Sequence, residues 1–139
     1  AVEAAGEACK EAGAKRVIPL KVSGPFHSAL LKDAGARLGE ELKKVEISDT
    51  FVPYIANVTA DYVTGKDEVK PLLQQQVSSS VKWQQTLERM IADGVEEFVE
   101  IGPGKTLSGF LKKIDREVKV SNIDKMEDFI RFVSEHAAM

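Results

Sequence analysis

The C-terminal third of the sequence alternates between strand-like and helix-like segments, and this order constrains the possible folds more than any other feature. Strands separated by a helix pair in parallel, because the helix returns the chain to the end of the sheet from which it left. The sequence therefore predicts an α/β fold with mixed or parallel strand pairing. This pattern consists of a predicted strand over 95–102, a helix over 105–114, a strand over 117–123 and a helix over 124–137.

The first two thirds of the chain give weaker strand signals. Pro19 restricts the predicted strand 16–22 (RVIPLKV) to an edge or a bulge, because proline cannot donate to a sheet. The chain also begins inside a helical pattern of alanines without a cap, so we expect it to be a fragment of a longer protein. The other predicted elements are helices over 2–13, over 28–44 with Ser28 as N-cap, over 66–76 and over 82–93, and a strand over 51–59.

Composition argues against several classes of protein. A length of 139 residues suits one domain, and the net charge of −3 without a Lys/Arg cluster argues against nucleic-acid binding. The sequence has neither an apolar run of about 18 residues, as a membrane span would need, nor a signal peptide. Cys9 is the only cysteine, so an internal disulfide is excluded and the cytosol is the expected compartment. Metal-ligand spacing is absent, and we expect no metal or cofactor.

His27, in the segment SGPFHS, is the first candidate for chemistry. An imidazole can take a proton from a hydroxyl group and return it to a leaving group. The alternative is a surface or capping histidine, since the neighbouring Ser28 is expected to point away from it. His136 lies in a polar tail and is expected to be solvated.

The other polar segments also have structural explanations that need no function. The segment Gly102-Pro103-Gly104-Lys105 has part of a phosphate-loop spacing, but a tight turn between a strand and a helix is the better explanation. Asn57 and Gln76 lie at the ends of elements, where amides usually bond to the backbone. Cys9 is expected to be a small buried or half-buried apolar residue, and no local signature supports a thiol hydrolase built from Cys9, His27 and Asn57.

Five stretches taken together carry a resemblance to a known family. They are PLKVSGPFHSALL, IANVTA, QQQVSSSVKW, EFVEIGPGKTLSGFLKKI and VKVSNI, in this order. The chain resembles the C-terminal half of bacterial malonyl-CoA:acyl carrier protein transacylases. The resemblance implies transfer of a malonyl group from malonyl-CoA, through a malonyl-serine ester, to the phosphopantetheine thiol of acyl carrier protein. Malonyl-CoA is then a substrate, and the chemistry needs no cofactor.

The resemblance also implies roles for four residues. His27 matches the catalytic histidine, and Gln76 matches the glutamine whose main-chain carbonyl holds that imidazole. Asn57 matches an asparagine that supports the histidine loop. Phe26 matches the residue before the histidine, where an aromatic ring favours malonyl over branched acyl groups. The Gly-Pro-Gly-Lys turn is then structural.

The family's nucleophile lies in a Gly-His-Ser-x-Gly turn, which this sequence lacks, as it lacks the family's arginine and oxyanion glutamine. We therefore expect the missing N-terminal half to supply them, and this chain alone to be inactive. Residues 1–21 would be the remnant of a ferredoxin-like small subdomain, and 22–139 part of an α/β hydrolase-like core.

Two other functions stay open. The chain could be a non-catalytic module that binds a carrier protein or a complementary chain, or a hydrolase that uses Cys9. Because carrier proteins are acidic, Lys105, Lys112 and Lys113 on one predicted helix are candidates for docking, unless they form an ordinary solvated face.

Overall fold

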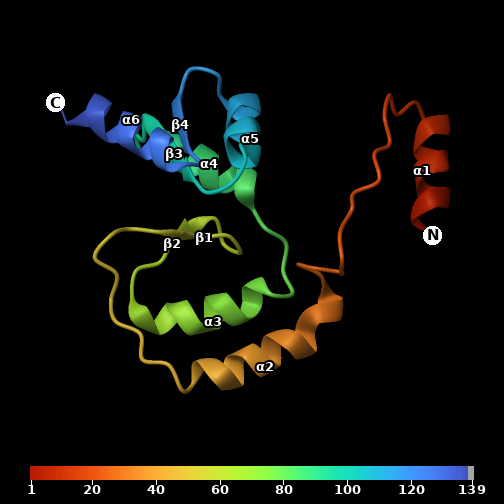
Figure 1. Cartoon of the computed structure of the whole chain (residues 1–139). Coiled ribbons are helices and arrows are strands. Elements are labelled where there is room, and N and C mark those ends of the chain that lie inside the picture. Colours follow the sequence, from red (N-terminus) through yellow and green to blue (C-terminus); the bar gives the residue numbers. More distant parts are fainter. Residues whose placement is uncertain (138–139) are drawn as a thin grey trace.

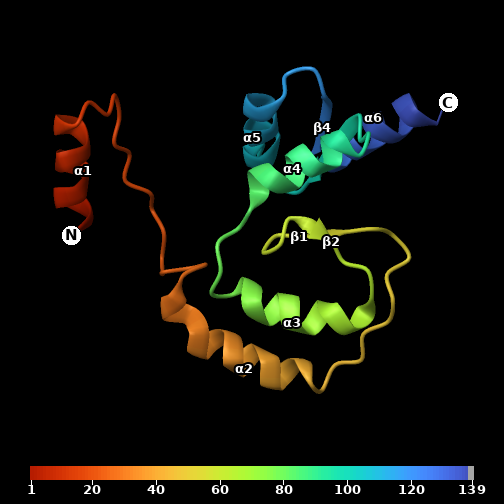
Figure 2. The same cartoon turned by 180° about the vertical axis from the view of Figure 1, so that it is seen from behind.

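The computed structural model describes residues 1–137, in which an N-terminal arm is followed by a middle unit (residues 29–76) and a C-terminal unit (residues 83–136) (Figure 1). Helix α1 (Val2–Glu11) and the extended segment after it project away from the rest of the chain, as the view from behind also shows (Figure 2). No residue of α1 is buried. Cys9 is exposed, so the expectation of a buried or half-buried thiol is wrong.

The C-terminal unit contains the parallel pair that the sequence predicts. Strands β3 (Glu97–Ile101) and β4 (Lys119–Ile123) pair in parallel, from Glu97 opposite Lys119 to Ile101 opposite Ile123. Helix α5 (Thr106–Ile114) connects them, and α4 (Trp83–Ala92) and α6 (Met126–His136) flank them in sequence. The α/β class and the parallel pairing are therefore confirmed.

The core of this unit forms because α4 and α5 turn apolar stripes toward the two strands. Leu87 of α4 and Leu111 of α5 are each only 3% exposed and pack with Val118, the residue before β4. Half-buried apolar side chains surround these three, namely Trp83, Ile91, Phe98, Ile114 and Val120.

The middle unit consists of two packed helices and a small hairpin. A short 3-10 helix, η1 (Ala29–Leu31), leads into α2 (Lys32–Leu42), which packs against α3 (Lys66–Gln76). Close approach of the two helices requires glycine at position 35, because a Cβ there would lie 3.0 Å from the carbonyl oxygen of Gln74. Strands β1 (Ile55–Ala56) and β2 (Asp61–Tyr62) pair antiparallel, and Ala56, Val58 and Val63 form a second small core.

Polar contacts of α4 and of the residue before it tie the middle unit to the C-terminal unit. The backbone N–H of Lys82 donates to the carbonyl of Asn57 at 2.8 Å, and Arg89 on α4 reaches Asp61 on β2 at 3.2 Å. The first contact fixes the start of α4 beside the β1–β2 turn.

Two strand predictions are wrong. Residues 16–22 are not a strand, because no other strand lies beside them within residues 1–137 and an extended segment needs a partner for its backbone hydrogen bonds. Ile18 and Leu20 in this segment are 66% and 79% exposed. The predicted strand 51–59 shrinks to β1, since the chain turns after Ala56 and returns as β2, which the sequence did not predict.

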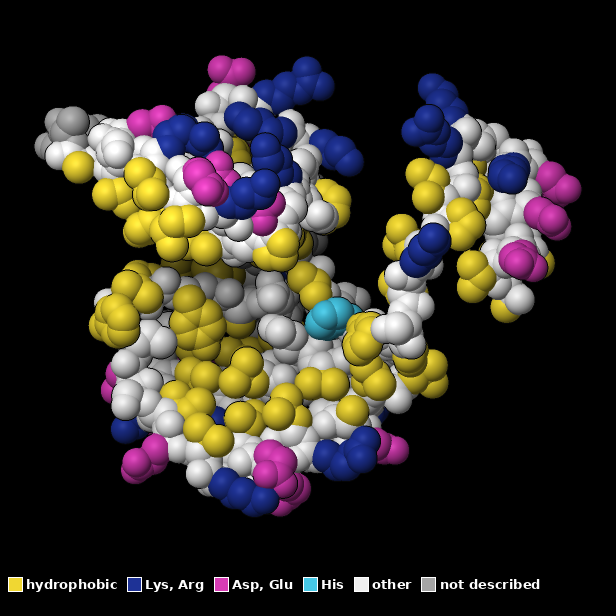
Figure 3. Space-filling model, in the orientation of Figure 1, with side chains coloured by type: hydrophobic (Ala, Val, Ile, Leu, Met, Phe, Trp, Pro, Cys, Tyr) yellow, Lys and Arg dark blue, Asp and Glu magenta, His cyan; other side chains and the backbone are white. Residues whose placement is uncertain are grey.

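Apolar side chains remain on the surface over much of the molecule, as Figure 3 shows for one face. Phe51 is 97% exposed, and Ile101 at the end of β3 is 79% exposed. Monomeric proteins rarely leave so many large apolar side chains uncovered.

Candidate functional site

His27 lies in a loop and has a backbone conformation that residues other than glycine rarely adopt. Its φ is +56°, in the left-handed region, and Ala60 is the only other non-glycine residue with positive φ among residues 1–137. This conformation costs a residue with a Cβ about 1–2 kcal/mol, so surrounding contacts must hold it. Strained residues of this kind cluster at functional sites, which makes the loop a candidate site.

The His27 ring is held by the end of a helix far away in the sequence. Its Nδ1 lies 2.9 Å from the main-chain oxygen of Gln76, 49 residues along the chain. A carbonyl oxygen only accepts, so Nδ1 carries the proton and Nε2 of the neutral ring keeps its lone pair. Nε2 makes no hydrogen bond within residues 1–137. His27 is exposed, and a histidine is visible on the surface in Figure 3 beside hydrophobic side chains.

The position of Gln76 suits this contact. Gln76 is the last residue of α3, and carbonyl groups in the last turn of a helix lack helical partners. Its oxygen also accepts a long bond from the backbone N–H of Ser79 at 3.4 Å. The helix C-terminus carries a partial negative charge, which stabilises an imidazolium formed when the ring takes a proton. The carbonyl of Gln76 thus holds one ring nitrogen of His27 and leaves the other nitrogen without a hydrogen bond in the described part of the chain.

Ser28 does not act as the sequence predicts. It precedes η1, but its hydroxyl makes no capping bond and instead donates to the carbonyl of Pro25 at 2.7 Å. The prediction of a side-chain N-cap is therefore wrong, because the loop turns sharply enough to bring Pro25 within reach of Ser28.

Phe26 and Asn57, the other two candidates, differ in exposure and in the residues around them. Phe26 is 62% exposed and folds over Gly24, where a Cβ would meet its ring at 3.5 Å. Asn57 is half-buried and lines a groove of about 680 Å³ with Trp83, Leu107, Phe110 and Lys113. No hydrogen bond joins Asn57 to His27 within the described residues.

The N-terminus of α5, which follows the Gly-Pro-Gly-Lys turn, binds a carboxylate of the chain itself. Glu100 accepts from the backbone N–H groups of Leu107 (3.1 Å) and Ser108 (2.8 Å) and from the Ser108 hydroxyl. These bonds, the hydroxyl foremost, lower the pKa of Glu100. Gly102 and Gly104 have φ of +137° and +86°, which explains the glycines. The N-terminus of α5 already holds an anion, so the structural interpretation of the turn is supported. An acidic residue at the end of a strand before such a turn was the available signal in the sequence, and it was missed.

His136 is not solvated, contrary to the prediction from its polar surroundings. Its side chain is 22% exposed and stacks on Phe132 with the ring centroids 4.0 Å apart. Its Nδ1 lies 2.7 Å from the carbonyl of Phe132, and its Nε2 lies 3.3 Å from Glu97 on β3. Helix α6 is amphipathic, and His136 lies on the side of the helix that contacts β3.

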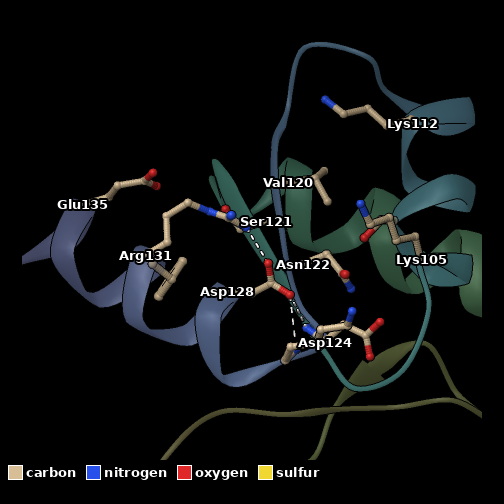
Figure 4. Close-up of a pocket in the computed structure, with 12 residues that line it drawn as sticks. Lys105, Lys112, Val120, Ser121, Asn122, Asp124, Asp128, Arg131 and Glu135 are labelled. Carbon is tan, nitrogen blue, oxygen red and sulfur yellow. Dashed lines mark hydrogen bonds and ion pairs between the residues drawn. The ribbon is translucent and has the colours of Figure 1, made fainter.

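A polar cavity of about 610 Å³ lies between β4, α5 and α6 (Figure 4). Lys105 and Lys112, two of the candidate docking residues, line it, whereas Lys113 lies over the ring of Phe110 at 5.8 Å. Lys112 is held by the carbonyl groups of Arg116 and Val118. Asp128 in this cavity accepts from the backbone N–H of Lys125 and pairs with Arg131 at 2.6 Å, and these contacts lower its pKa. Asp128 therefore pairs with Arg131, and no salt bridge of the described residues joins it to Lys105 or Lys112.

Within residues 1–137, no group of three or more His, Cys, Asp or Glu side chains could bind a metal ion. No helix of this part of the chain has the length and apolar character to cross a membrane.

Solved structures with the same fold are malonyl-transferring acyltransferases. The malonyl transacylase of Streptococcus pneumoniae superposes with a TM-score of 0.88 and 40% identity, over 96% of this chain and 44% of that chain. A type II polyketide synthase acyl-carrier protein in complex with its malonyl-transacylase gives a TM-score of 0.90 and 34% identity, over 97% and 44% of the two chains. No protein-family model matches the sequence.

Curated proteins with similar sequences are named malonyl CoA-acyl carrier protein transacylases. The malonyl CoA-acyl carrier protein transacylase of Bacillus subtilis is 48% identical over 126 residues, which are 91% of this chain and 40% of the relative. The chain matches the C-terminal portion of the malonyl CoA-acyl carrier protein transacylases. It spans about 40% of the length of the curated relatives.

Proposed function

We propose that this chain supplies the general base of a malonyl-CoA:acyl carrier protein S-malonyltransferase of fatty acid synthesis in the cytosol. The observation that carries the proposal is the 2.9 Å contact between Nδ1 of His27 and the main-chain oxygen of Gln76. It leaves Nε2 with a free lone pair on a residue that is exposed. A base must have its accepting atom free and its other nitrogen held, and His27 meets both conditions.

The reaction proceeds in two halves. Nε2 of His27 takes the proton of a serine hydroxyl while the serine oxygen attacks the thioester carbonyl of malonyl-CoA. The C–S bond then breaks, and the imidazolium returns the proton to the CoA sulfur. In the second half the thiol of the carrier protein gives its proton to Nε2 and attacks the malonyl-serine ester, whose oxygen recovers the proton on leaving.

The other candidate residues take supporting roles. Gln76 orients the ring and stabilises its cationic form, and Asn57 stabilises the region beside the His27 loop. Phe26 limits the space for an α-branch on the acyl group. Its 62% exposure is compatible with a place at the mouth of an acyl site.

The nucleophile must come from elsewhere, because the 139 residues contain no Gly-His-Ser-x-Gly turn. We place it in the portion of the relatives that this chain does not span, and we expect this chain alone to transfer nothing. In this proposal residues 1–21 belong to a ferredoxin-like small subdomain and 22–139 to an α/β hydrolase-like core. The exposed apolar side chains of the arm and of β3 would then be covered by that portion.

The proposed partner is an acidic acyl carrier protein. One similar structure contains an acyl-carrier protein bound to its malonyl-transacylase. Lys105 and Lys113 are exposed on or beside α5, and Lys113 borders the groove that also contains Asn57. These lysines are therefore the candidates for contact with the carrier protein, and Lys112 contributes less because carbonyl groups hold it.

The test is an intact-mass assay of malonyl transfer to a phosphopantetheine-bearing carrier protein. The protein is this chain joined to the N-terminal portion of a curated relative. His27→Ala should lower the rate about 10²–10⁴-fold, the usual contribution of a general base. His136→Ala is the matched control and should keep the rate. Wild-type transfer by His27→Ala would overturn the proposal.

A second candidate is a non-catalytic module that binds a carrier protein or a complementary chain, and the absence of the serine turn favours it. The joined protein discriminates the two functions. If it binds carrier protein but transfers no malonyl group, the module is the better description.

A further inference from the structure

The hydroxyl of Ser28 closes the loop that carries His27. It donates to the carbonyl of Pro25 at 2.7 Å, and this bond spans Phe26 and His27. Ser28 is half-buried, and its own carbonyl accepts from the backbone N–H of Leu31 at 3.0 Å. One residue thus ties the loop backward to Pro25 and forward to η1.

The bond matters because His27 needs external support. A φ of +56° is disfavoured for a residue with a Cβ, so the backbone relaxes toward ordinary conformations unless its neighbours are fixed. The ring contact to Gln76 fixes the side chain only. The Ser28–Pro25 bond fixes the two backbone segments on either side of the strained residue.

We propose that Ser28 is a positioning residue for the His27 base, an inference that rests on the proposed function. Ser28 is not a nucleophile in this arrangement, because its proton is donated to Pro25 and no hydrogen bond joins it to His27 within the described residues. Its role is to keep Nδ1 of His27 on the Gln76 carbonyl, and thereby to keep the proton off Nε2.

The first test reads the ring directly, without any transfer reaction. Nitrogen NMR of the 139-residue chain reports which imidazole nitrogen carries the proton, and the chain has only two histidines. His27 should be in the Nδ1–H form in the wild type and shift toward the Nε2–H form in Ser28→Ala. Ser28→Thr keeps the hydroxyl and should keep the Nδ1–H form. Unchanged His136 signals show that a variant is folded.

Matched variants make the result specific to the hydroxyl. Ser23→Ala removes an exposed serine hydroxyl near the same loop and should change nothing. Should Ser28→Ala fail to fold, Ser28→Val replaces it, since valine has the branched shape of threonine but no hydroxyl to donate. An unchanged His27 tautomer in the folded Ala or Val variant overturns the inference.

The second test uses the joined protein. Ser28→Ala should lower kcat about 10- to 100-fold with little change in KM, because a misplaced base harms the chemical step rather than binding. The two proposals fail in different ways. Full activity of His27→Ala overturns the proposed function, whereas an inactive His27→Ala together with a fully active Ser28→Ala overturns only the inference about Ser28.

Discussion

His136 at the end of α6 places its Nε2 3.3 Å from both carboxylate oxygens of Glu97 on β3. Its Nδ1 faces a second acceptor, the carbonyl of Phe132. Only an imidazolium can donate from both nitrogens at once. The pair therefore joins α6 to the sheet through a contact between residues 39 positions apart in the sequence.

Acid should weaken this part of the fold. The pKa of Glu97 is lowered, first by its hydrogen bond from Lys119 and then by His136. The unfolded chain, where a glutamate has a pKa of about 4.3, therefore binds more protons in acid than the folded chain does. The stabilisation is present above that value and is lost as the pH falls through the lowered pKa. Thermal unfolding between pH 3 and 7 should show a flatter profile for Glu97→Gln than for the wild type, and parallel profiles would contradict the role of this carboxylate.

Glu100→Gln should lower the thermal midpoint at neutral pH. The carboxylate accepts two backbone N–H bonds and one hydroxyl bond at the start of α5, where a negative charge is favourable. Glu96→Gln is the control, because Glu96 is exposed and its side chain makes no hydrogen bond in the described part of the chain. Equal melting temperatures of the two variants in calorimetry would contradict a stabilising role of the Glu100 carboxylate.

Leu87→Ala should lower the free energy of unfolding by about 2–5 kcal/mol, the usual cost of truncating a buried leucine. Leu87 is 3% exposed and packs with Leu111 and Val118. Leu107→Ala on α5 is the comparison, since Leu107 is 41% exposed and should cost much less. Urea unfolding measures both, and equal losses would mean that the core is not where the structure places it.

Two glycine substitutions should act in opposite directions. Gly35→Ala brings a methyl group to 3.0 Å from the carbonyl of Gln74 and should loosen the packing of α2 on α3. Gly109 lies within α5, and a Cβ at this position would meet no atom within 4 Å, so Gly109→Ala should stabilise the helix by about 1 kcal/mol. Chemical unfolding distinguishes them, and stabilisation by Gly35→Ala would contradict the close approach of these helices.

Local sequence patterns correctly predicted those helices and strands that depend mainly on their own residues. The helix predicted over 66–76 has those bounds in the structure, and the two strands of the parallel pair differ from prediction only at their ends. The segment 16–22 has strand-forming residues but no partner strand among residues 1–137, and propensity does not supply one. β2 is only two residues long, which is too short for a pattern.

Local sequence patterns predicted less of the candidate site than of the secondary structure. The contact between His27 and Gln76 spans 49 residues, so spacing along the chain could not reveal it, and only the family resemblance suggested it. His136 was misjudged for a related reason, because its partner Glu97 lies 39 residues earlier. Glu100, in contrast, lies close in sequence to the N–H groups that it binds.

The offset between β3 and β4 has a consequence for the order of folding. Each residue of β3 pairs with one 22 positions later, and the connection contains α5. Closing a short loop costs less chain entropy than closing a long one, so we expect this unit to assemble early on the folding pathway. The bond between His27 and Gln76 closes a loop more than twice as long. The His27 ring would therefore reach its final orientation late, on a framework that has already formed.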